Sequence, residues 1–117
     1  MKERILSVVL SVVLALFAVS ASIAAPILCR PFYYAQIDAL SIPESTGWSK
    51  EVIREAFDDM MDYELKGEPF RTGQLKWSQS GYSHFADVKT LFWMDLDLAA
   101  GTAAALLVLW ILSRKWK

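Results

Sequence analysis

The chain has 117 residues, of which 55% are hydrophobic and 21% are charged, and its formal net charge is −1. One cysteine and one histidine exclude an internal disulfide and leave no ligand set for a zinc site. Neither a phosphate-binding glycine loop nor a basic stripe for nucleic acid occurs. We therefore expect no cofactor, no metal and no nucleic-acid partner.

Two uncharged runs lie near opposite ends of the chain. The first, Ile5–Cys29, is long enough to cross a bilayer as a helix. The second, Leu98–Ser113, falls slightly short of a core of about 30 Å at about 1.5 Å per residue, so its helix should begin earlier, near Met94 or Asp95. The predicted fold is an all-α membrane protein, with two transmembrane helices joined by a helical extracytoplasmic region.

Basic residues flank both runs and predict the topology. Lys2 and Arg4 precede the first run, and Arg114, Lys115 and Lys117 follow the second. Basic residues near span ends favour the cytoplasmic side, so we expect a multi-pass protein of the cell membrane with both termini cytoplasmic. The expected parts are the N-terminus with transmembrane helix 1 (1–29), an extracytoplasmic helical region (30–95), and transmembrane helix 2 with a basic tail (96–117).

The first run also fits a cleaved secretory signal, because a basic start precedes an apolar stretch and small residues near Ala21–Ala25. The run is longer than the apolar part of a usual signal, which favours an uncleaved span. Cys29 is interpreted as a small apolar residue at the membrane edge, since bulky Ile27 and Leu28 precede it rather than the small residues typical of a lipid-modified cysteine.

One helix in the middle region has clear ends. Ser49 is predicted to cap a helix from Lys50 to about Lys66, which Gly67 and Pro69 end. Apolar residues at three- and four-residue spacing predict one buried face, made of Ile53, Ala56, Phe57, Met60 and Met61. The carboxylates of this helix lack metal-site spacing and are interpreted as a solvated face, made of Asp58, Asp59, Asp62 and Glu64.

The other middle segments are an aromatic-rich stretch and two loops. Residues 30–34, with a proline and three aromatic residues, are interpreted as an interfacial anchor for the first span. Residues 41–47 and 70–79 are predicted to be loops.

The segment Ser80–Lys89 contains the only histidine. A histidine is suited to moving protons near neutral pH, and Asp87 lies one helical turn from His84, close enough to orient its ring. We expect a helix that Ser80 or Ser83 caps and that continues almost unbroken into the second span. The alternative is that His84 only packs or caps this helix, while Lys89 reaches the lipid headgroups.

The string Trp77-Ser78-Gln79-Ser80-Gly81-Tyr82-Ser83-His84-Phe85-Ala86-Asp87-Val88-Lys89-Thr90-Leu91-Phe92 resembles the signature of a bacterial integral membrane family, the lipoprotein intramolecular transacylases of Gram-positive bacteria. These enzymes move an acyl chain from the diacylglyceryl group of a lipoprotein's N-terminal cysteine to that cysteine's α-amine. Family members usually have about four spans, and this chain looks like the N-terminal half.

The resemblance implies a membrane O-to-N acyltransferase that acts on bacterial lipoproteins among membrane lipids. His84 would be the catalytic base and acid, with Asp87 orienting it. Lys89, Ser83 or Tyr82 would stabilise the oxyanion, and the substrate-binding residues would be Ser80, Gly81, Tyr82, Ser83 and Lys89. The alternatives are a truncated inactive relative, or a non-catalytic membrane hairpin that serves as a scaffold or as the partner of a second membrane subunit through Phe57, Met60 and Met61.

Overall fold

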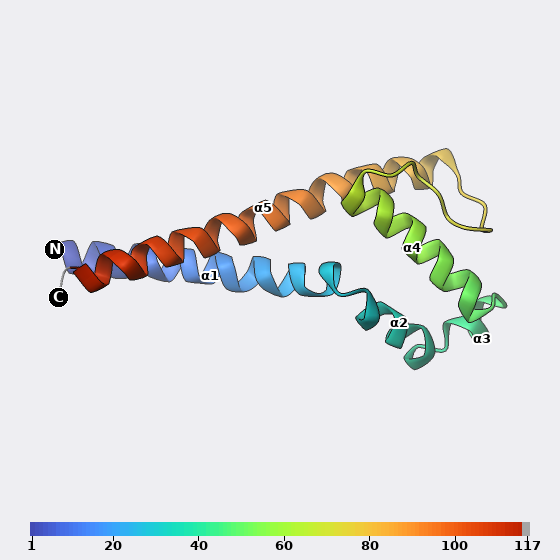
Figure 1. The fold of residues 1–117 in the computed structure, drawn as a ribbon, viewed down its shortest axis with the longest axis horizontal. Helices are drawn as coiled ribbons and strands as arrows, with labels where there is room; N and C mark the ends of the chain where they lie inside the picture. Colours follow the sequence, from blue (N-terminus) through green and yellow to red (C-terminus); the bar gives the residue numbers. More distant parts are fainter. Residues whose placement is uncertain (116–117) are drawn as a thin grey trace. The chain divides into compact units, whose positions relative to one another are not determined.

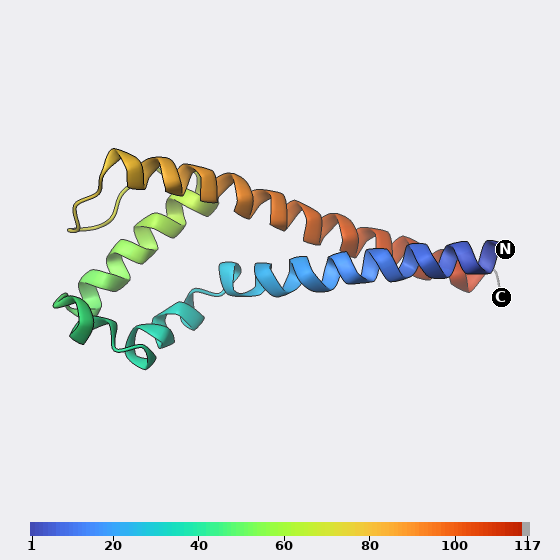
Figure 2. The ribbon, with the colours of Figure 1, turned by 180° about the vertical axis from the view of Figure 1, so that it is seen from behind.

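The computed structural model describes residues 1–115, which are helical except at the connections, the longest of which is residues 67–78, and contain no strand (Figure 1). The helices are α1 (Lys2–Leu28), α2 (Arg30–Ala39), α3 (Ile42–Thr46), α4 (Lys50–Lys66) and α5 (Gln79–Lys115), and Figure 2 shows them from behind. Trp116 and Lys117, at the end of the predicted basic tail, lie outside the described residues. The predicted all-α fold is confirmed.

α1 and α5 are long and apolar enough to cross a membrane, with mean hydropathies of 2.6 and 1.9 over their most apolar windows. α1 contains Pro26 close to its C-terminal end. α5 runs without interruption from Gln79 to Lys115, so the prediction that the His84 helix continues into the second span is confirmed.

The chain divides into two compact units. Unit 1 contains Met1–Ala25 and the chain from Met94 onward. Its buried hydroxyl groups are satisfied within their own helices: Ser20 Oγ donates to the carbonyl of Leu16, and Thr102 Oγ1 to the carbonyl of Leu98, both at 2.7 Å. Such bonding is suited to a helix in lipid, where water is absent.

Unit 2, Pro26–Trp93, contains α2, α3 and α4 with the adjoining ends of α1 and α5. The ends of α4 are set locally, as predicted. Ser49 Oγ accepts a hydrogen bond from the Val52 amide at 3.3 Å, and Gly67 ends the helix at a φ of +71°, which suits glycine. The predicted apolar face is confirmed, with Ile53, Ala56 and Met61 buried and Phe57 and Met60 half-buried.

The prediction of a loop at residues 41–47 was wrong, and residues 30–34, for which no secondary structure was predicted, are helical too. Residues 30–34 open α2, and residues 41–47 contain α3. Each of these helices has a proline in its first turn, where the missing amide hydrogen is harmless and the fixed φ favours a helix. Ser41 and Gly47, both with positive φ, turn the chain at the two ends of α3.

The predicted solvated face of α4 was also wrong for three of its four carboxylates. Asp58 and Asp62 pair with Arg30 of α2, at 3.4 and 2.6 Å, and Tyr34 donates a hydrogen bond to Asp58. Glu64 is buried, with 2% of its surface exposed. The sequence separates Arg30 from these partners by about thirty positions, so the pairing depends on α2 folding back onto α4.

Candidate functional site

Residues 79–93, the N-terminal part of α5, carry the predicted site and are called the motif segment below. Ser78 begins this helix: its Oγ accepts a hydrogen bond from the Gly81 amide at 3.0 Å, and its carbonyl accepts one from the Tyr82 amide at 2.9 Å. The prediction that Ser80 or Ser83 is the cap was therefore wrong by a few positions. The whole motif is helical, so its side chains point outward at about 100° per residue.

One side of the motif segment, the α4 side, packs onto aromatic residues. The Tyr82 ring lies 5.2 Å from the Phe70 ring and 6.1 Å from the Tyr63 ring, centroid to centroid. Phe85 is 5.7 Å from Phe70, and Trp77 is 5.2 Å from Phe70 at right angles. These contacts hold the loop after α4 against the motif segment.

Lys89 and Trp93 extend the α4 side by one helical turn each. The Lys89 ammonium lies 4.5 Å from the centre of the Tyr63 ring, a cation–π contact. Trp93 Nε1 donates a hydrogen bond to the carbonyl oxygen of Glu64 at 2.9 Å. Both residues therefore meet the last turn of α4, at Tyr63 and Glu64.

The Glu64 carboxyl group is the most unusual polar group of unit 2. It is buried, and neither Oε1 nor Oε2 has a hydrogen-bond partner within residues 1–115. Burial raises its pKa from 4.5 to about 7, while the positive charge of Lys89 acts in the opposite direction. The sequence interpretation missed this group.

The opposite, exposed side of the motif segment carries His84 and Asp87. The His84 ring meets the edge of Phe85, with 5.5 Å between ring centres. Neither His84 nor Asp87 makes a hydrogen bond or an ion pair with any described residue. Ser80 and Ser83 are exposed as well. The predicted site residues are thus divided between the exposed side and the α4 side, where Tyr82 and Lys89 lie.

Two hollows of unit 2 are lined in part by other residues of the motif segment. The larger, of about 280 Å³, has the Ser78 cap at its edge and is lined mainly by Ala56, Met60, Phe70, Thr72, Trp77 and Phe85. The smaller, of about 210 Å³, is lined by Pro26, Ile27, Phe32, Tyr33, Phe57, Met61 and Phe92. The apolar lining of the second makes it suited to hydrocarbon rather than to a charged ligand.

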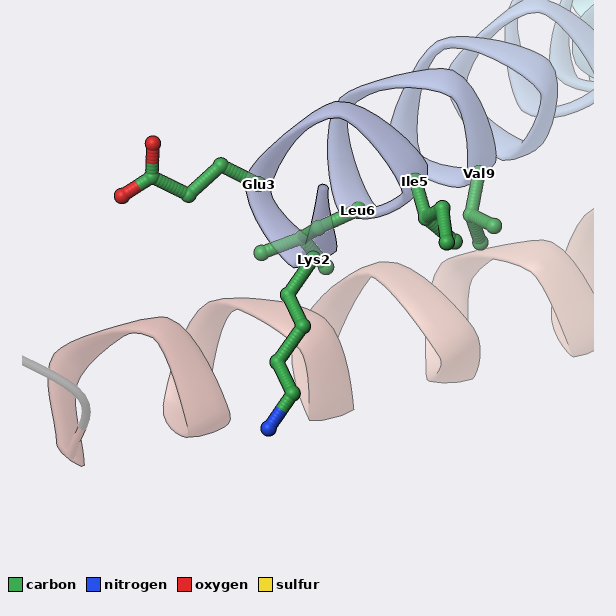
Figure 3. Close-up of a pocket in the computed structure, with 5 residues that line it drawn as sticks. All are labelled: Lys2, Glu3, Ile5, Leu6 and Val9. Carbon is green, nitrogen blue, oxygen red and sulfur yellow. The ribbon is translucent and has the colours of Figure 1, made fainter.

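A hollow of about 680 Å³ lies at the start of α1, far along the chain from the motif (Figure 3). Its lining is mostly aliphatic, from Ile5, Leu6 and Val9. Figure 3 shows the charged ends of Lys2 and Glu3 pointing away from each other, so no polar groups converge there. It has no feature of a catalytic site.

Comparison with known proteins identifies the family. The family model described as lipoprotein intramolecular transacylase Lit matches residues 8–117. The in meso structure of the membrane integral lipoprotein intramolecular transacylase Lit from Bacillus cereus has a similar fold, with a TM-score of 0.84 and 23% sequence identity. The similarity covers 97% of this chain and 55% of that one, so the chain spans about half the length of the solved structure. No curated protein matches the chain.

Proposed function

Because this chain belongs to the lipoprotein intramolecular transacylase family, we propose that it takes part in acyl transfer within bacterial lipoproteins. The acyl chain moves from the diacylglyceryl group of the N-terminal cysteine to the α-amine of that cysteine. The observation that carries the proposal is the family match, which includes the whole motif segment. The prediction of the family from residues 77–92 is confirmed by it.

His84 is the proposed catalytic residue. The substrate amine nitrogen attacks the ester carbonyl carbon, a carbon–nitrogen bond forms, and the carbon–oxygen bond to glycerol breaks. His84 takes the proton that the amine loses and returns it to the departing glyceryl oxygen, so the reaction needs no further reactant. Donor and acceptor belong to one molecule, which favours direct transfer without an acyl-enzyme. The exposure of His84 supports the proposal, because a lipid-linked substrate can reach the ring.

The remaining predicted residues take different proposed roles on the two sides of the helix. Asp87, one turn from His84 on the exposed side, orients the ring. Ser83, next to His84 and also exposed, is suited to donating a hydrogen bond to the oxyanion. Ser80 and Gly81 belong to the proposed substrate-binding turn. Tyr82 and Lys89 would serve a substrate group that approaches from the α4 side.

The proposed setting is the cell membrane, with both termini cytoplasmic and residues 30–95 outside. The basic residues that flank α1 and α5 support this orientation. Membrane lipids and a lipoprotein are the proposed partners. The alternative of a second subunit bound through the apolar face of α4 is not supported, because this face packs within unit 2. Phe57 stacks on Tyr33 with 3.7 Å between ring centres, and Met61 is buried.

The experiment compares lipoproteins by mass spectrometry in cells that make the chain, the His84→Ala variant or neither. We expect lyso-form lipoproteins with the unchanged chain and none with His84→Ala at equal membrane abundance. Thr90→Ala, an exposed change in the same helix, is the matched control and should behave like the unchanged chain. Lyso-form lipoproteins at an undiminished level in the His84→Ala cells would exclude His84 as the proton carrier.

A further inference from the structure

The last turn of α4 presents an arrangement that packing alone does not explain. Glu64 is 2% exposed, and both oxygens of its side chain lack a hydrogen-bond donor within the described chain. A buried carboxyl group without partners is rare, because the ionised form is poorly solvated there. Such a group either stays neutral or interacts with a nearby cation.

The nearby cation is Lys89. Its ammonium group lies over the ring of Tyr63, the neighbour of Glu64, and it has no hydrogen-bond or ion-pair partner among residues 1–115. The remaining titratable groups around this turn are Tyr63 itself and Tyr82 of α5. Asp62 and Lys66 on α4 pair with each other at 3.5 Å, and Asp62 also pairs with Arg30 of α2. Among the described residues around this turn, Lys89 is therefore the cation without an ion-pair partner and Glu64 the carboxyl group without one.

We propose that Glu64 is a positioning residue for Lys89, whose ammonium group it holds on the α4 side of the motif segment when its carboxyl group is ionised. Trp93 supports this arrangement, since its indole fixes the Glu64 backbone one helical turn from Lys89. Gain of a proton by Glu64 removes the attraction and frees the flexible Lys89 side chain, which is long enough to change direction. The consequence for catalysis rests on the proposed function, in which Lys89 is a candidate donor to the substrate.

The Glu64 carboxyl group changes from neutral to ionised near neutral pH, because burial raises its pKa to about 7. Lys89 should then report on the ionisation of Glu64. Loss of this spectral change in Glu64→Gln would assign it to the Glu64 carboxyl group.

The test follows Lys89 by NMR in the full chain in micelles, with its lysines labelled by ¹³C-methylation and the Lys89 signal assigned with Lys89→Arg. We expect the signal to shift with a midpoint near pH 7, and Glu64→Gln to remove that transition. The matched control is Glu55→Gln, an exposed carboxylate of the same helix, which should leave it in place. A Lys89 signal without a transition near pH 7, or one that persists in Glu64→Gln, would overturn the proposal.

A second variant keeps the carboxyl group and removes the cation. The titration of Glu64 is followed by NMR with ¹³C-labelled carboxyl groups. Lys89→Met should raise its midpoint by about one pH unit, and an unchanged midpoint would overturn the coupling.

A measurement of activity separates this inference from the proposed function. A step near pH 7 in the rate of acyl transfer, removed by Glu64→Gln, places Lys89 in the reaction. A chain without acyl transfer but with the coupled titration counts against the proposed function alone.

Discussion

Replacing Glu64 by glutamine should stabilise unit 2 at pH 8 and do so much less at pH 5. Burial raises the Glu64 pKa from 4.5 to about 7, so the folded chain keeps this proton up to about pH 7, whereas the unfolded chain releases it above 4.5. The stability that this group contributes is complete below pH 4.5 and is lost as the pH rises to 7. The free energy of unfolding lost in this way is on the order of 3 kcal/mol, at about 1.4 kcal/mol per pKa unit.

The assay is thermal unfolding in micelles, followed by near-ultraviolet circular dichroism, which reports on the aromatic cluster of unit 2. One kcal/mol shifts the Tm of a small domain by about 4–8 °C, so Glu64→Gln should unfold about 10 °C or more above the unchanged chain at pH 8. Glu55→Gln, exposed on the same helix, should show no such difference. An equal Tm change at pH 5 and pH 8 would refute the reasoning, because it would mean that Glu64 does not change its charge between them.

Three further predictions follow from the site and the fold. Asp87→Asn should lower acyl transfer per folded protein without abolishing it, because an orienting group matters less than the group that moves the proton, and an undiminished rate at equal membrane abundance would contradict the orienting role. In a chain whose own cysteine is replaced by serine, a cysteine at Lys66 should react with an impermeant reagent added outside and one at Arg114 should not; the reverse pattern would invert the topology. Arg30→Met should lower the free energy of unfolding by about 1–2 kcal/mol at pH 7. The loss should be smaller at pH 3, because Arg30 lowers the pKa of Asp62 and the stability that this carboxylate contributes is lost as the pH falls through its folded pKa. Equal losses at pH 7 and pH 3 would argue against the ion pair.

Local chemistry explains why α4 and the continuity of α5 could be predicted. The Ser49 cap and the Gly67 turn act within a few residues of the helix ends, so the sequence contains all that determines them. α3 was missed because Pro43 was taken as a signal of a loop, and α2 was missed because Pro31 and the aromatic residues after it were interpreted only as an interfacial anchor. A proline in the first turn is equally compatible with a helix, and the packing of α2, α3 and α4 on one another decides between the two.

A signal for the burial of Glu64 was present in the sequence. Glu64 follows Met60 by four residues and Met61 by three, so it continues the apolar stripe of α4. The carboxylate was assigned to a solvated face because the acidic residues of α4 lack metal-site spacing, and its place in the apolar stripe was not considered. The placement of Lys89 on the α4 side has no comparable local signal, because helical spacing gives the angle between Lys89 and His84 but not which of them faces a neighbour.

The hydroxyl groups of the two membrane helices have a consequence for how the protein is made. Ser7, Ser11, Ser20 and Ser22 of α1, and Thr102 and Ser113 of α5, each donate to a carbonyl three or four residues earlier in the same helix. A helix whose hydroxyl groups are satisfied internally can enter a bilayer before it meets a partner helix. During biosynthesis, membrane insertion of each span can therefore precede the folding of unit 2, whose aromatic cluster and ion pairs join residues far apart in the chain.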